Sequence, residues 1–231
     1  MRVYKFLSKR FAFEALRNRR LKISQLSDLN DPFDLLPFDV SEPKLRRFLE
    51  MTMSHLSNVR RRGILCFSLT SSNPVVWAHY AEKHYGMCLG FDVSDTPEPL
   101  AVPVEYVSSR KTFPLSPSEI ENASIAVLKR VADQMLFTKY ADWHYEDEAR
   151  MWASTDDPEG ELFFVGFGDV LRLREVIVGI RCLATKRDVE DALDGYPEPV
   201  EILKAGAALD SFSIVSDASG FANRRTSGTA G

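Results

Sequence analysis

The chain has 231 residues, of which 45% are apolar, and a formal net charge of −4. A chain of this length can bury a sizeable core and corresponds to one domain, with or without an extension. The acidic balance argues against a nucleic-acid partner, and the basic runs at 17–20 and 59–63 are typical of solvated faces. The first residues lack a signal-peptide pattern and no window approaches membrane-spanning length. We therefore expect a soluble cytoplasmic protein without a membrane partner.

The cysteines point to a reducing compartment. Cys66, Cys88 and Cys182 are odd in number, far apart and set in apolar surroundings. This pattern predicts buried thiols, and it indicates neither a disulfide framework nor a metal site.

Helices and strands are mixed along the chain without strict alternation. We predict helices at 11–20, 44–62, 73–86, 116–140 and 185–195, from apolar spacing and capping signals. Strands are predicted at 2–7, 21–24, 63–72, 87–93, 102–107, 145–153, 161–167 and 175–180, with a hairpin at 200–216. This order predicts a single α+β domain over 1–216, with a mixed, largely antiparallel sheet flanked by helices, and a disordered tail at 217–231.

Three of these helices carry clear boundary signals. Asn73 and Gly86 are placed to cap the helix at 73–86, with Gly86 in the left-handed conformation. Ser116 and Glu119 form a capping-box pattern before a long helix, and Thr185 precedes another.

The segment WHYEDEARMW (143–152) places charge beside aromatic surface. In a strand, Glu146, Glu148, Arg150 and Trp152 share one face, and carboxylates two residues apart have Cα atoms roughly 7 Å apart. One carboxylate could then be polarised by Arg150 while the other acts as acid or base. The alternative is an ion-paired face without chemistry, and in a helix Glu146 and Arg150 form an ordinary i,i+4 pair.

Two further segments supply candidate ligand-binding residues. The helix NPVVWAHYAEKHYG carries a stripe with Trp77, Tyr80 and His84, beside His79. Such a stripe is more often core than a binding site, and the histidine spacing does not favour a shared metal. In LNDPFD (29–34), side chains including Asn30 and Asp31 could fix the loop or coordinate a polar ligand, and Ser68 could point a hydroxyl into a cleft.

These segments together resemble the bacterial family catalogued as domain of unknown function 2971. The resemblance rests on the order VYKF, LNDPFD, CFSLTSSNPVVWAHYAEKHYGMCLGFD, VEYV and WHYEDEARMW, spread over roughly 1–205. It implies membership of a class and no particular reaction.

A second resemblance, to ADP-ribosyltransferase folds, suggests a mechanism. Those folds begin strand–helix–strand, carry a Ser/Thr-bearing middle strand and place a catalytic Glu late, often in a Glu-x-Glu pair. The resemblance implies Glu148 on the ribose of NAD, Glu146 orienting the acceptor, Tyr4 or Lys5 near NAD, and Ser68 supporting the site. The first strand departs from the pattern, because it offers Tyr4 and Lys5 where such enzymes carry His or Arg.

Two hypotheses of different class follow. In one, the protein is a nucleotide-linked transferase or hydrolase, with NAD as substrate and a role in phage defence or as a toxin. In it, Glu148, Glu146 and His79 are catalytic, and the other candidates bind a small-molecule or nucleotide ligand. In the other, it is a non-catalytic sensor or protein-interaction module whose polar residues form a structural network. The two differ in Glu148, which should be water-accessible with a raised pKa in the enzyme and fully bonded in the network.

Overall fold

The computed structural model describes residues 1–56, 61–94 and 100–224. The chain folds into two compact units. The first consists of Met1–Leu21, Phe67–Leu100 and Gly166–Gly231, and the second of Lys22–Cys66 and Ala101–Val165. We refer to them as unit 1 and unit 2. Neither unit is one continuous segment, since the chain passes repeatedly from one to the other.

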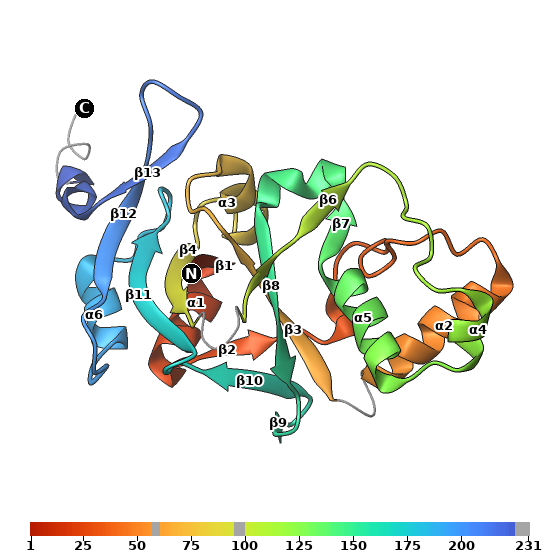
Figure 1. The fold of residues 1–231 in the computed structure, drawn as a ribbon. Helices are drawn as coiled ribbons and strands as arrows, with labels where there is room; N and C mark the ends of the chain where they lie inside the picture. The colour runs from red at the N-terminus through yellow and green to blue at the C-terminus, as the bar shows by residue number, and fades with distance from the viewer. Residues whose placement is uncertain (57–60, 95–99, 225–231) are drawn as a thin grey trace. The chain divides into compact units, whose positions relative to one another are not determined.

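Unit 1 is built on a twisted sheet (Figure 1). The order is β13-β12-β11-β4-β1, and the end of β3 follows β1. Tyr4 of β1 stands opposite Ser68 of β3. The β11–β12 pair is parallel, while β1–β4, β4–β11 and β12–β13 are antiparallel. These strands are β1 (Arg2–Leu7), β3 (Arg62–Ser68, which begins in unit 2), β4 (Met87–Val93), β11 (Leu171–Val178), β12 (Glu201–Ala207) and β13 (Ile214–Asp217).

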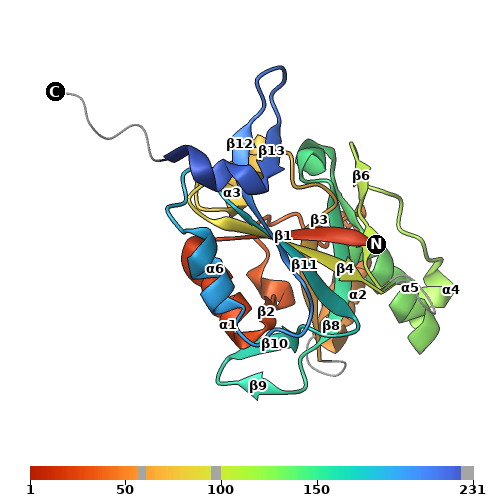
Figure 2. The ribbon, with the colours of Figure 1, turned by 90° about the vertical axis from the view of Figure 1, so that its left-hand side faces the viewer.

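The helices of unit 1 are short and capped by side chains. α1 (Lys9–Asn18) packs against α6 (Lys186–Ala192), as Figure 2 shows, and α3 (Pro74–Tyr80) packs against β1. Ser8, Asn73 and Thr185 cap the three helices by accepting a hydrogen bond from a backbone N–H of the first turn. The predicted capping roles of Asn73 and Thr185 are confirmed.

Unit 2 contains three sets of strands. β8 (Glu148–Ser154) lies between β3 and the short β5 (Val102–Pro103). β6 (Glu105–Val107) pairs in parallel with β7 (Thr138–Tyr140). A small sheet has the order β2-β10-β9, formed by β2 (Arg20–Ile23), which begins in unit 1, β10 (Leu162–Gly166) and β9 (Pro158–Glu159).

Helices α2 (Pro43–Ser54) and α5 (Ile125–Leu136) pack on one another in unit 2, with α4 (Pro117–Glu121) preceding α5 (Figure 1). Short 3₁₀ turns stand at η1 (Leu26–Asp28) and η3 (Ala141–Glu146). The apolar core of this unit gathers side chains from both helices, the LNDPFD segment and β3; its buried members are Leu26, Leu35, Phe38, Phe48, Leu49, Ile64, Leu115, Val131, Met135 and Leu136.

The α+β fold class is confirmed, and the sheets are mixed and largely antiparallel. Several predicted boundaries are wrong. The predicted helix at 116–140 is two helices, because Asn122 ends α4 and Ser124 caps α5, and its last residues form β7. The predicted capping box of Ser116 and Glu119 is confirmed. The predicted strand at 145–153 starts only at Glu148, because η3 precedes it.

The helix predicted at 73–86 ends at Tyr80. Glu82, Lys83 and His84 follow with φ of 51°, 54° and 71°, so the left-handed turn is made by these residues and not by Gly86. Gly86 is needed for a different reason. A Cβ atom there would lie 2.0 Å from the carbonyl oxygen of Leu7.

The ends of two other predicted segments fall partly outside the described residues. In the helix predicted at 44–62, α2 reaches Ser54 and a π-helical turn continues through Leu56, while 57–60 lie outside the described residues. In the predicted tail, Asp217 belongs to β13 and Ala218–Arg224 form the 3₁₀ turns η4, while 225–231 lie outside the described residues. Within the described residues, no helix is long and apolar enough to cross a membrane.

Candidate functional site: a buried charge network

Five charged side chains of unit 2 meet in its interior. Lys139 donates to Glu146 at 2.6 Å and to Glu148 at 3.0 Å. Arg150 binds Glu148 through two hydrogen bonds of 2.8 and 2.9 Å, and binds Asp34 through two of 2.8 and 3.0 Å. All five are buried, with Arg150 at 0% exposure. We call this set the charge network.

The local backbone explains how Glu146 and Glu148 reach the same lysine. Glu146 ends η3 and Glu148 begins β8, so the two do not lie on one strand face as predicted. Asp147 between them has a φ of 44°, a left-handed conformation that asparagine and aspartate adopt more readily than most residues. This turn directs both flanking carboxylates toward Lys139 of β7.

The ion pairs affect the pKa values of Glu148 and Lys139 more strongly than burial does. Burial alone would raise the pKa of Glu148, but the charge and hydrogen bonds of Arg150, together with Lys139, hold it below its ordinary value. Burial alone would lower the pKa of Lys139, but Glu148 and Glu146 raise it above its ordinary value. The carboxyl of Glu148 is therefore an ionised acceptor, and the ammonium of Lys139 a permanent donor.

Neutral groups complete the bonding around the network. The backbone N–H of Glu148 donates to the Tyr106 hydroxyl at 2.8 Å, and burial raises the pKa of that phenol to about 12. Arg150 also donates to the carbonyl of Leu136 at 3.0 Å, and the Cys66 thiol bonds to Glu148. Of the cysteines predicted to be buried, Cys88 and Cys182 are buried, whereas Cys66 is half-buried and all three are free thiols.

The predicted loop LNDPFD contributes to this network through Asp34. Asp31 is buried and its carboxylate accepts from the backbone N–H of Phe33 at 2.9 Å, so it fixes the loop in the way the sequence favoured. Asn30 is exposed. Both LNDPFD and WHYEDEAR were candidate segments in the sequence, and Asp34 of the first bonds to Arg150 of the second. Lys139 was missed because the sequence placed it at the end of a predicted helix.

The other predicted site residues lie in unit 1. The Trp77 ring is fully buried, its Nε1 donates to the carbonyl of Ser71 at 2.7 Å, and it stacks with His84 at a centroid distance of 6.3 Å. His84 Nδ1 is buried without a hydrogen-bond partner, and burial, with the charge of Arg181, lowers the pKa of that imidazole. His79 and Tyr80 are exposed at the end of α3.

Tyr4 and Lys5 are half-buried on β1, where Ser68 pairs with Tyr4. Burial, with the charge of Glu175, raises the pKa of the Tyr4 phenol. These residues remain candidates for ligand binding, as do His79, Tyr80 and His84. Among the residues that the structure describes, no group of three or more His, Cys, Asp or Glu side chains could hold a metal ion.

A hollow of about 310 Å³ lies beside the charge network in unit 2. Lys139 and Thr138 line it, together with Phe33 of the LNDPFD loop and Arg110. Arg110 is already engaged, because its guanidinium donates to the carbonyls of Leu36 and Phe38 and stands over the Phe33 ring, 5.6 Å from its centroid. We call this the Phe33 hollow.

Part of the chain matches a known protein family. Residues 76–151 match the family described as "Protein of unknown function (DUF2971)", so the predicted resemblance to that family is confirmed over this stretch. The matched residues include most of α3, all of β4 and the charge network except Asp34. No curated protein and no solved structure matches the chain significantly.

Proposed function

We propose that this protein is a small-molecule-binding module in which the charges of WHYEDEAR hold unit 2 together and carry out no reaction. The observation that supports this is the bonding of Glu148. Both of its oxygens accept hydrogen bonds from Arg150, one also accepts from Lys139, and its side chain is 5% exposed. With the bond from the Cys66 thiol, these contacts occupy the four acceptor positions of the carboxylate, so none is left for a substrate.

The electrostatics support the same reading. A general acid or base at neutral pH needs a carboxyl pKa raised toward 7. The pKa of Glu148 is lowered instead. Glu148 then stays ionised and fixed, which suits a residue that positions β7, β8 and the LNDPFD loop around a binding site.

A second candidate function, ADP-ribosyl transfer from NAD, is favoured by the order of the strands. The chain begins β1–α1–β2, Ser68 ends β3 opposite Tyr4, and β8 begins at Glu148. This is the order that the resemblance to ADP-ribosyltransferase folds implies. In this candidate function, substrate binding would have to release Glu148 from Arg150 and Lys139.

One experiment separates the two. Nicotinamide release from NAD is measured for the wild type and Glu148→Gln, with urea unfolding of both. We expect no release from either protein and a destabilisation of Glu148→Gln by about 3–5 kcal/mol, because a buried ion pair is broken. Glu105→Gln, which removes an exposed partner of Lys111, should cost about 1 kcal/mol or less.

The opposite pattern would overturn the proposal. Release of nicotinamide by the wild type, lost in a Glu148→Gln variant that unfolds at the same urea concentration, would make Glu148 a catalytic residue.

A further inference from the structure

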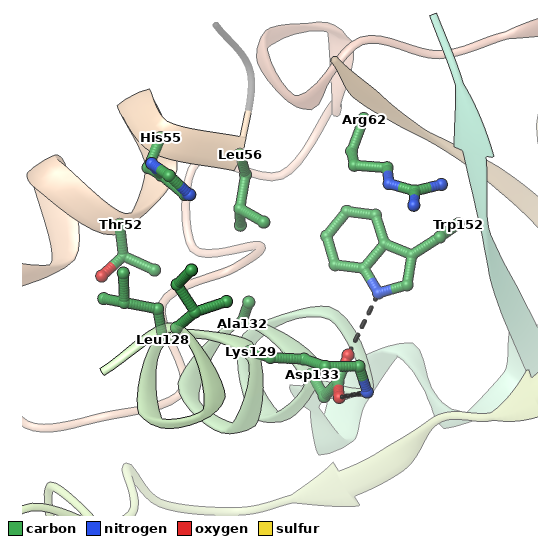
Figure 3. A pocket seen from close by; sticks show the side chains of 10 residues that line it. Thr52, His55, Leu56, Arg62, Leu128, Lys129, Ala132, Asp133 and Trp152 are labelled. Carbon is green, nitrogen blue, oxygen red and sulfur yellow. Dashed lines mark hydrogen bonds and ion pairs between the residues drawn. The ribbon is translucent and has the colours of Figure 1, made fainter. Parts of the chain in front are cut away.

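A second hollow in unit 2 lies between two helices and two strands (Figure 3). Its volume is about 290 Å³, close to the lower size of small-molecule sites. We call it the Trp152 pocket. The residues that line it are Thr52, His55, Leu56, Arg62, Ile125, Leu128, Lys129, Ala132, Asp133 and Trp152.

The Trp152 ring is held in a fixed orientation. Its Nε1 donates to Asp133 Oδ1 at 3.1 Å, and Lys129 donates to Asp133 Oδ2 at 2.9 Å. In Figure 3 the ring stands on one side of the pocket, with Leu56 and Leu128 across from it. A fixed indole opposite aliphatic side chains forms a slot suited to a flat apolar group.

The charge in the pocket is positive. Lys129 and Asp133 compensate one another, whereas Arg62 makes no ion pair with any residue that the structure describes. Figure 3 places Arg62 on the same side as Trp152. A guanidinium binds a carboxylate through two parallel hydrogen bonds. The Phe33 hollow differs in this respect, because Arg110 and Lys139 already bind protein acceptors there.

We propose that the Trp152 pocket binds a planar aromatic carboxylate, with the ring against Trp152 and the carboxylate on Arg62. This inference rests on the proposed function, since it names the ligand class and the site of the binding module. Trp152 would then bind ligand from the same strand, β8, that carries Glu148 and Arg150 of the charge network.

The test uses 2-naphthoate and its neutral isostere 2-naphthamide with the full chain, by calorimetry. We expect saturable binding of 2-naphthoate by the wild type, at least tenfold tighter than 2-naphthamide. Arg62→Gln should weaken 2-naphthoate roughly tenfold and leave 2-naphthamide unchanged, and Trp152→Phe should weaken both. The matched control is Arg47→Gln, which removes an exposed arginine of α2 that does not line the pocket.

Two results would overturn the inference. One is the absence of saturable 2-naphthoate binding by the wild type. The other is equal affinity for the acid and the amide, a comparison that requires no variant. These failures differ from failure of the proposed function, which would appear as nicotinamide release from NAD whatever the naphthoate result.

Discussion

At the scale of single residues, Arg150 links distant parts of unit 2. It is fully buried and binds two carboxylates from distant parts of the chain, Asp34 and Glu148. Arg150→Met should leave three buried carboxylates facing Lys139 alone. We expect a loss of about 3–5 kcal/mol in the free energy of unfolding, measured in urea. Arg10→Met, which breaks an exposed i,i+4 pair with Glu14, should cost less than about 0.5 kcal/mol. An equal effect of both variants would contradict the network.

The charges of the network also predict how stability depends on pH. The folded-state pKa of Glu148 is lowered, so its contribution is present above its unfolded pKa of about 4.3 and is lost as the pH falls through the lower folded value. The folded-state pKa of Lys139 is raised, so its contribution is present below about 10.4 and is lost only as the pH rises through the higher folded value. Urea unfolding between pH 3 and 6 should therefore show a shallower acid slope for Glu148→Gln than for the wild type. Identical slopes would exclude Glu148 as a source of the acid dependence.

At the scale of elements, the turn between α3 and β4 is tight because β1 lies against it. A Cβ atom on Gly86 would lie 2.0 Å from the Leu7 carbonyl oxygen and 2.9 Å from backbone atoms of Ala81. Backbone atoms cannot move aside as a flexible side chain can, so Gly86→Ala should cost about 3 kcal/mol or more. Gly168→Ala is the matched control, since no atom lies within 4 Å of the added Cβ atom. Thermal unfolding of both variants gives the comparison, and equal melting temperatures would refute the close approach.

The helices and strands also show how much of the fold the sequence predicts. Helix starts were predicted correctly where a side chain caps the backbone of the adjacent turn, as at Asn73, Ser116 and Thr185. Boundaries were predicted wrongly where the local structure depends on residues far away in the sequence. Nothing in the apolar spacing of 116–140 marks the break at Asn122, and the role of Lys139 depends on Glu146 and Glu148 folding back over β7. Similarly, the left-handed turn at 82–84 contains no glycine, so composition alone could not predict it.

At the scale of the whole molecule, the family match spans both units. Residues 76–100 belong to unit 1 and 101–151 to unit 2, because the chain passes from one unit to the other at Leu100. The family stretch therefore carries the Trp77–His84 stack of one unit and most of the charge network of the other. Arg62 and Trp152 lie outside it.

The charge of the whole molecule bears on its partners. The formal net charge is −4. Two arginines of the basic run at 17–20 contact other residues of unit 1. Arg19 donates to the Asp194 carbonyl at 2.9 Å, and Arg17 stands over the Phe13 ring at 5.3 Å. In the run at 59–63, residues 59 and 60 lie outside the described residues. Fluorescence anisotropy with duplex DNA and single-stranded RNA at about 150 mM salt should show no binding tighter than about 10⁻⁴ M, the weak end of non-specific affinity. Two results together would overturn this expectation: binding that is tighter and weakens steeply with salt, and weaker binding by Arg17→Gln. A steep salt dependence requires contacts between basic side chains and phosphates.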